Sequence, residues 1–231
     1  MVSCQNSPPE QRQEPTVGFY HWQQEWDTAS AQHCLLQAYP QSPLYLKVFD
    51  VVWANSRPEP RAQISLVAKS LPASLVAVVF ITNEVFTSAR AQQRETLANE
   101  LLEELKLRLQ AHPYQELQID CDWTTSSRAA YFDFLRQLKA RLPVATALTA
   151  TVRLHQFRRP AEQGLPPVDR GLLMAYNLGD LNQWESKNTI LDTLISAQYL
   201  QPQPIAYPLP LDVALPYYEW GCSTARASSP C

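Results

Sequence analysis

Two aspartates at alternate positions are the residues of this sequence that are best spaced to do chemistry. The stretch 116–123 reads ELQIDCDW and has the period of a strand, so Asp120 and Asp122 share one face while apolar residues occupy the other. Two close carboxylates can raise the pKa of one of them, which then acts as a general acid beside a base. Because both lie on one strand wall, about 6.5–7 Å apart at Cα, we expect a second acid from another strand to complete a catalytic pair.

Three further acids follow other predicted strands, and each is a candidate partner. They are Glu84, Asp180 and Asp212. In α/β folds the carboxyl ends of the strands, here called the mouth, are where sites form. We therefore expect one of these acids to face Asp122 or Asp120 across the mouth.

Asp120 also has a structural interpretation, in which it is held by a cation inside the fold. Arg153 and Lys47 lie on other predicted strands and either neutralise Asp120 or contact substrate. A metal site made of Asp120, Asp122 and His155 is a further alternative. The sequence favours no metal, because no Cys/His cluster has zinc spacing.

Aromatic and polar residues at the predicted strand ends suggest what the mouth binds. Four tryptophans fall near strand ends: Trp22, Trp53, Trp123 and Trp220. Tyr176 and Asn177 end a strand and can bind hydroxyl groups, and His155 is either a ligand, a base or an interior histidine. Because sugar rings bury well against aromatic faces, this set favours a glycan.

Composition excludes several classes of function. The 231 residues are 45% hydrophobic, carry a formal charge of −3 and include 19 prolines but 5 glycines. No glycine-rich phosphate loop, G-x-S-x-G elbow or basic stripe is present, so we expect no nucleotide cofactor and no nucleic-acid partner. No apolar run approaches the roughly 20 residues of a membrane span.

Strand and helix patterns alternate along the chain, which predicts βα units and a parallel sheet. Seven strands are predicted, near residues 17–22, 42–53, 75–82, 116–123, 147–156, 171–177 and 205–215. In the second strand Tyr45, Lys47 and Phe49 are expected to share one face, and 57–61 is expected to be a proline loop. Polar inward faces on the fourth and fifth strands favour a (β/α)8 TIM-type barrel over a doubly wound sheet, the alternative.

Several of these strand ends together resemble a group of uncharacterised bacterial lipoproteins. The matching motifs are DCDW at 120–123, RLHQ at 153–156, PPVDRG at 166–171, MAYNLGD at 174–180 and YPLPLDVALP at 207–216. Those lipoproteins are thought to be barrels related to glycoside hydrolases, and the resemblance covers roughly residues 16–220. It implies a cell-envelope location and a role on carbohydrate.

A more distant resemblance is to the chitinase-type barrels, whose fourth strand reads D-x-x-D-x-D-x-E. Asp120 and Asp122 match its two later aspartates, but Leu117 replaces the first. Thr124 stands where that family has its catalytic glutamic acid, and a threonine hydroxyl is far too weak an acid to replace it. The resemblance therefore leaves two hypotheses: a glycoside-hydrolase-like enzyme using strand-end carboxylates, or a carbohydrate-binding lipoprotein without turnover.

The two ends of the chain differ from its middle. Residues 1–4 read MVSC, like the end of a lipoprotein signal, which predicts lipidation at Cys4 and a bacterial periplasmic or outer-membrane location; residues 1–15 would then be a flexible tether. The barrel domain is expected over 16–220, and 221–231 is expected to be a disordered, out-of-frame tail. After Leu215 too few residues remain for an eighth βα unit, so we expect an open, truncated barrel.

Overall fold

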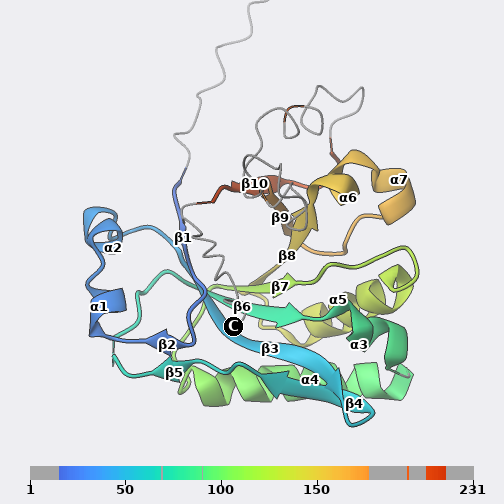
Figure 1. Cartoon of the computed structure of the whole chain (residues 1–231), viewed down its shortest axis with the longest axis horizontal. Coiled ribbons are helices and arrows are strands. Elements are labelled where there is room, and N and C mark those ends of the chain that lie inside the picture. The colour runs from blue at the N-terminus through green and yellow to red at the C-terminus, as the bar shows by residue number, and fades with distance from the viewer. Residues whose placement is uncertain (1–15, 69, 90, 177–196, 198–206, 217–231) are drawn as a thin grey trace, which may run out of the picture.

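The computed structural model describes residues 16–68, 70–89, 91–176, 197 and 207–216. Its main sheet has eight strands, of which seven form a parallel path: β1 (Phe19–His21), β3 (Leu44–Ala54), β6 (Leu75–Ile81), β7 (Glu116–Asp120), β8 (Ala147–Arg153), β9 (Arg170–Met174) and β10 (Leu211–Ala214). The helices are α1 (Thr28–Ala31), α2 (Cys34–Ala38), α3 (Asn83–Ser88), α4 (Ala91–Arg108), α5 (Arg128–Arg141), α6 (Leu154–Arg158) and α7 (Pro160–Gln163). Figure 1 shows how they alternate.

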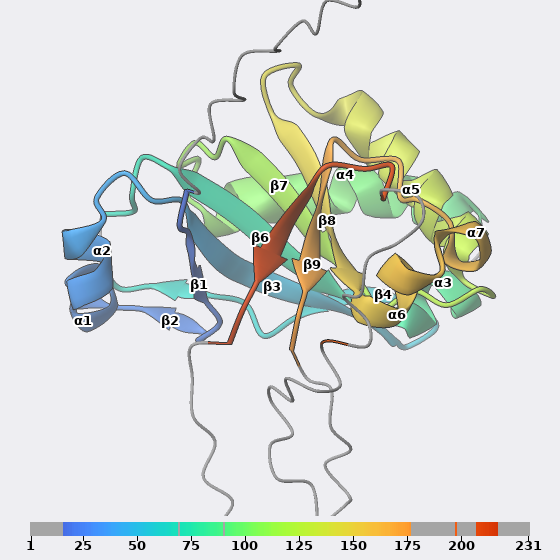
Figure 2. The same cartoon turned by 90° about the horizontal axis from the view of Figure 1, so that it is seen from above.

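The strands pair in chain order, β1-β3-β6-β7-β8-β9-β10, and every neighbouring pair along this path is parallel. A doubly wound sheet would reverse its order at a switch point, so this order is that of a barrel. The sheet curls until β10 turns back toward β1 (Figures 1 and 2). Within the described ranges β1 and β10 are the two ends of the path and do not pair with each other. The prediction of an incomplete (β/α) barrel of about seven strands is confirmed.

The apolar core lies between the convex face of the sheet and helices α3, α4 and α5. β6 is a run of β-branched and aliphatic residues buried on both faces, as a central parallel strand requires. On α4 the i,i+4 row Leu97, Leu101, Leu105 and Leu109 faces the sheet and is almost fully buried. This core leaves the concave face of the sheet for polar side chains.

One predicted loop is a strand. Residues 57–61 form β4 (Arg57–Arg61), which pairs antiparallel with the second half of β3. Its prolines are tolerated because β4 lies at an edge, where no further strand needs their missing N–H groups. Glu59 is buried there and accepts hydrogen bonds from Arg57, Arg61 and Asn55, which lower its pKa. The loop prediction failed because it considered proline without the pairing partner.

Smaller elements complete the description. β2 (Glu25–Trp26) and β5 (Ser65–Leu66) form a separate two-stranded sheet. None of the helices in the described ranges has the length and hydropathy of a membrane span. The predicted tether 1–15 with Cys4 and the predicted tail 221–231 lie outside the described residues.

Candidate functional site

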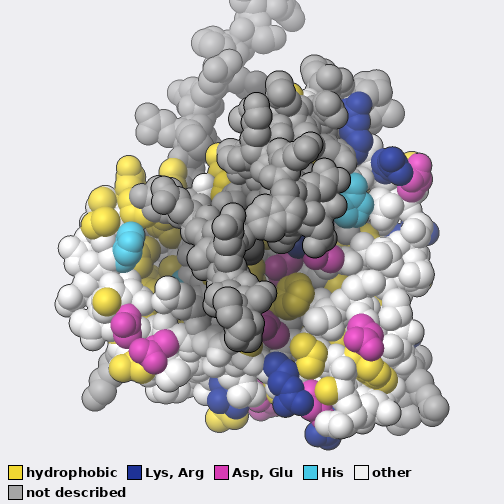
Figure 3. Space-filling view, viewed as in Figure 1, with side chains coloured by type: hydrophobic (Ala, Val, Ile, Leu, Met, Phe, Trp, Pro, Cys, Tyr) yellow, Lys and Arg dark blue, Asp and Glu magenta, His cyan; other side chains and the backbone are white. Residues whose placement is uncertain are grey.

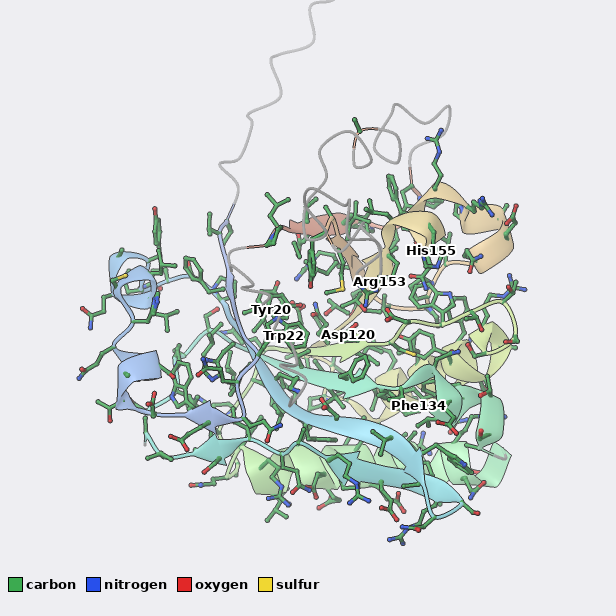
Figure 4. The ribbon with its side chains drawn as sticks, viewed as in Figure 1. Tyr20, Trp22, Asp120, Phe134, Arg153 and His155 are labelled. Atoms are coloured by element: carbon green, nitrogen blue, oxygen red, sulfur yellow. The ribbon has the colours of Figure 1, made fainter. Side chains whose placement is uncertain are left out.

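Charged side chains from three strands meet at the mouth on the concave face of the sheet. Asp120 ends β7, Thr151 and Arg153 come from β8, and Lys47 and Asp50 come from β3. Figure 4 shows Asp120 and Arg153 side by side, with Tyr20 close to them. In Figure 3 acidic and hydrophobic side chains lie side by side near the centre of the view.

A β-bulge in β3 brings two opposite charges onto the concave face. The register with β6 shifts between Lys47 and Phe49, so that Val48 is the extra residue. Val48 and Phe49 both enter the convex core, and Lys47 and Asp50 both face inward. Their side chains form an ion pair of 3.0 Å. The prediction that Phe49 shares the face of Lys47 is wrong because the bulge changes the alternation.

Asp120 is the buried acid of the mouth. It is 4% exposed and accepts a hydrogen bond of 2.7 Å from the Thr151 hydroxyl. Burial raises the pKa of Asp120 to about 6, and the charges of Asp122 and Asp50 push in the same direction. The Thr151 hydrogen bond and the Arg153 charge oppose the rise without cancelling it. Asp120 can therefore take up or release a proton near neutral pH.

Asp122 is the exposed acid of the mouth, and Arg153 holds it. The guanidinium donates from Nε to Oδ1 and from Nη2 to Oδ2, the second bond measuring 2.8 Å. Arg153 was expected to neutralise Asp120, but its direct partner is Asp122, and it acts on Asp120 only through its charge. A carboxylate held by both oxygens is a poor candidate for a free base or nucleophile.

Three aromatic rings, here called the aromatic stack, run from the rim into the barrel. Trp22, directly after β1, stacks on Tyr20 with centroids 5.2 Å apart and an interplanar angle of 8°, and Tyr20 stacks on Tyr45 at 4.6 Å. Trp22 is 39% exposed, whereas Tyr45 is buried. The Tyr20 hydroxyl donates to Gln118 Oε1 on β7. The stack thus offers one accessible indole held from behind (Figure 4).

The other expected tryptophans do not line the mouth. Trp123 is completely buried, stacks on Tyr131 and donates from its indole to the Gln163 carbonyl at 3.1 Å. Trp53 packs against the convex core. Both are structural residues rather than ligand contacts, because the chain turns their rings toward the helices. Trp220 lies outside the described residues.

The expected partner acids are not brought opposite Asp122. Glu84 lies in the first turn of α3 and is exposed. Asp212 is the second residue of β10, rather than its end, and pairs with Arg170 at 2.5 Å. Asp180 lies outside the described residues. The acid that another strand does contribute near Asp120 is Asp50, which sequence reasoning missed.

The polar ligands predicted at the rim are placed as follows. His155 lies on α6 and not on β8; it is exposed, and partial burial is the main cause that lowers its pKa. Tyr176 follows β9, is half-buried and lies close enough to act electrostatically on Tyr20 and Arg153. Asn177 lies outside the described residues. The described part of the chain holds no group of three or more His, Cys, Asp or Glu arranged to bind a metal ion.

Thr124 occupies the position at which chitinase-type barrels carry their acid. Its hydroxyl is 2.9 Å from the Ser126 hydroxyl, and its backbone N–H donates to Ser127 Oγ. Ser127 in turn donates to Asn83 after β6. This hydroxyl cluster closes the loop between β7 and α5, so position 124 stabilises the loop rather than supplying a proton.

Comparison with known proteins supports the fold. No protein-family model matches the chain, and no curated protein matches it. The chain is similar to the chitinase domain of the spore coat protein CotE from Clostridium difficile, with 12% identity and a TM-score of 0.53 over 95% of this chain and 69% of that domain. It also matches the spore cortex-lytic enzyme SleL of Bacillus cereus, with 17% identity and a TM-score of 0.40 over 72% of this chain and 42% of that one. The chain thus spans less than half the length of SleL, and the CotE likeness establishes the barrel fold.

Proposed function

We propose that the mouth of this half-barrel binds an oligosaccharide and does not cleave it. The observation that carries the proposal is that two acidic residues of the mouth are already paired with cations. Both carboxylate oxygens of Asp122 accept hydrogen bonds from Arg153, and Asp50 forms an ion pair with Lys47. A glycosidase needs one carboxyl group free to protonate the leaving oxygen and a second carboxylate placed across the bond. Thr124 cannot supply the first of these.

The remaining chemistry of the mouth suits sugar recognition. Trp22 offers an accessible aromatic face, on which the C–H face of a pyranose can stack. Arg153, Asp122 and the nearby Tyr176 provide donors and acceptors at the rim for hydroxyl groups. An aromatic platform beside polar groups of both signs is typical of glycan sites.

A glycan-binding assay with product analysis tests this proposal. Chitin, peptidoglycan and plant-glucan oligosaccharides are screened on an array, hits are measured by calorimetry, and the mixtures are analysed by mass spectrometry. We expect affinity without product, and weaker but still measurable affinity in Trp22→Ala. The matched control is Tyr39→Ala, which removes an exposed aromatic that lies before β3, at the opposite end of the strands from the mouth. Release of shortened glycan by the wild-type protein overturns the proposal.

Hydrolysis is the second candidate function, and one observation favours it. Asp120 can be protonated near pH 6 and has Asp50 and Asp122 close by, so an acid beside bases does exist in the mouth. If the chain cleaves a glycan, Asp120→Asn abolishes product formation, and so does Asp50→Asn or Asp122→Asn if that residue is the base. Product formation that survives Asp120→Asn excludes Asp120 as the acid.

The proposal includes attachment to the bacterial cell envelope through a lipid on Cys4. Its support is the sequence at 1–4 and the resemblance to envelope lipoproteins. Metabolic labelling with a palmitate analogue tests it in a bacterial host that expresses the gene with its own upstream sequence. We expect labelled protein that is lost in Cys4→Ser, with Cys34→Ser as the control; equal labelling of all three contradicts the anchor.

A further inference from the structure

A second polar cluster, here called the interior network, fills the concave face below the mouth. From Tyr20 on β1 it passes to Gln118, whose amide donates to the Thr149 hydroxyl at 3.4 Å. Thr149 donates to Glu116 Oε1 at 2.6 Å. Gln118, Thr149 and Glu116 are each more than nine-tenths buried, so the network lies inside the fold rather than on its surface.

Arg170 extends this network to the last strand of the sheet. Its guanidinium donates to Glu116 Oε2 at 2.6 Å and pairs with Asp212 on β10 at 2.5 Å. Arg170 therefore bridges two carboxylates that are three strands apart, on β7 and β10. A planar guanidinium can make both contacts at once, which a lysine ammonium on a single stem does less well.

The interior network joins the two edges of the sheet. β1 and β10 are the ends of the strand path and share no backbone pairing in the described part of the chain. Yet side chains connect Tyr20 on β1 to Asp212 on β10 without a break, and the charge of Asp212 also acts on Tyr45 of β3. In a closed barrel, strand pairing performs this connection and fixes the curvature.

We infer that Arg170 is a positioning residue for the aromatic stack, whose exposed member Trp22 is the proposed sugar platform. Through the interior network Arg170 keeps the sheet curved and holds Tyr20, and therefore Trp22, in place at the mouth. This inference rests on the proposed function only for the role of the platform. Glu116 starts β7 and Asp120 ends it, so Arg170 acts from about 13 Å below the mouth. The effect of Arg170 extends from the interior network to Trp22 because the Trp22 indole stacks on Tyr20.

The first test needs no ligand. In 15N-labelled protein the indole signal of Trp22, assigned from Trp22→Phe, is compared between wild type, Arg170→Met and the control Lys139→Met. The control removes an ion pair with Asp169, which lies at the same end of the sheet but outside the network. We expect the Trp22 signal to move in Arg170→Met and to stay in Lys139→Met. An unmoved signal in a folded Arg170→Met protein overturns the inference.

Arg170→Lys serves if Arg170→Met does not fold, since it keeps the charge but loses the double contact. The same two outcomes then decide. For binding, a double-mutant cycle with Trp22→Ala separates positioning from general destabilisation. We expect the Arg170 substitution to weaken affinity about fivefold when Trp22 is present and by less than about twofold in Trp22→Ala. Equal losses of glycan affinity in both backgrounds contradict a positioning role for Arg170. If the wild-type protein has no glycan affinity at all, the proposed function is wrong, and the Trp22 indole signal alone decides the inference about Arg170.

Discussion

The Arg153 guanidinium at the end of β8 binds both carboxylate oxygens of Asp122, which lies two residues after the end of β7. This ion pair lies close to the buried Asp120, and its two members shift the pKa of Asp120 in opposite directions. The electrostatics of the mouth can therefore be changed in either direction by a single substitution.

Substitutions in this pair should move the pKa of Asp120 in opposite directions. Arg153→Met removes a positive charge that opposes the rise, so we expect the Asp120 pKa to increase above about 6; Asp122→Asn removes a negative charge, so we expect it to decrease. Carboxyl 13C chemical shifts followed through a pH titration measure both. Because the pair is partly exposed, we expect each variant to lose no more than about 1 kcal/mol of stability. Shifts of the same sign in the two variants refute this account.

The raised pKa of Asp120 predicts a specific dependence of stability on pH. An aspartate that titrates at 3.8 when unfolded and at about 6 when folded binds its proton first in the folded state. Stability from this group is thus full below pH 3.8, falls as pH rises toward 6, and is absent above it. We expect wild type to gain of the order of 3 kcal/mol relative to Asp120→Asn between pH 7.5 and pH 3.5.

Urea unfolding of both proteins at a series of pH values measures this difference. The asparagine keeps the shape and can still accept from Thr151, so other acids that titrate in the same range cancel in the comparison. We expect the unfolding free energy of wild type minus that of Asp120→Asn to fall as pH rises. If this quantity does not change with pH, or increases as pH rises, Asp120 is not a buried ionisable group.

Two tryptophans that look alike in the sequence should behave differently. Trp123 is completely buried among Tyr131 and Phe132, so Trp123→Ala should destabilise the fold by about 3–5 kcal/mol. Trp22 is partly exposed and loses mainly its stacking on Tyr20, so Trp22→Ala should cost no more than about 1.5 kcal/mol. Chemical denaturation decides; a larger loss for Trp22 means that it belongs to the core.

Gly164 should resist replacement. It ends α7 with a φ of 77°, and a Cβ there would lie 2.8 Å from both Arg128 Cδ and Phe132 Cε2. We expect Gly164→Ala to cost about 1–3 kcal/mol through backbone strain and crowding. Ala161→Gly, at an exposed position of the same helix, is the control and should cost about 1 kcal/mol or less. A thermal midpoint unchanged by Gly164→Ala contradicts this expectation.

The sequence was sufficient to locate the strands of the parallel path along the chain, because local patterns carry them. Alternation in 116–123, the β-branched run of β6 and the leucine row of α4 are each readable without tertiary information. The carboxyl-end position of Asp120 and Asp122 followed from the βα unit alone.

The composition of the mouth was harder to predict because it depends on pairing. Asp50 faces inward only through a register shift against β6, and no residue within β3 announces that shift. Trp123 and Trp53 fall near strand ends in the sequence just as Trp22 does, and only their packing in the fold distinguishes them from Trp22. The polar inward positions of β7 and β8 indicated that part of the interior network exists. The sequence did not indicate that Arg170 and Tyr20 join it, because they come from distant strands.

The bulge at Val48 also determines how β3 can vary in length. Because Val48 is the residue that β6 leaves unmatched, a chain lacking it would return to plain alternation, with Phe49 on the convex side and Asp50 still inward. An extra residue placed within regular pairing elsewhere in β3 would instead invert the faces beyond it, turning Val51 inward and Asp50 into the core. The strand is thus tolerant of deletion at one position, and proteins of this architecture could lose that residue while keeping both the charged lining and the packing behind it.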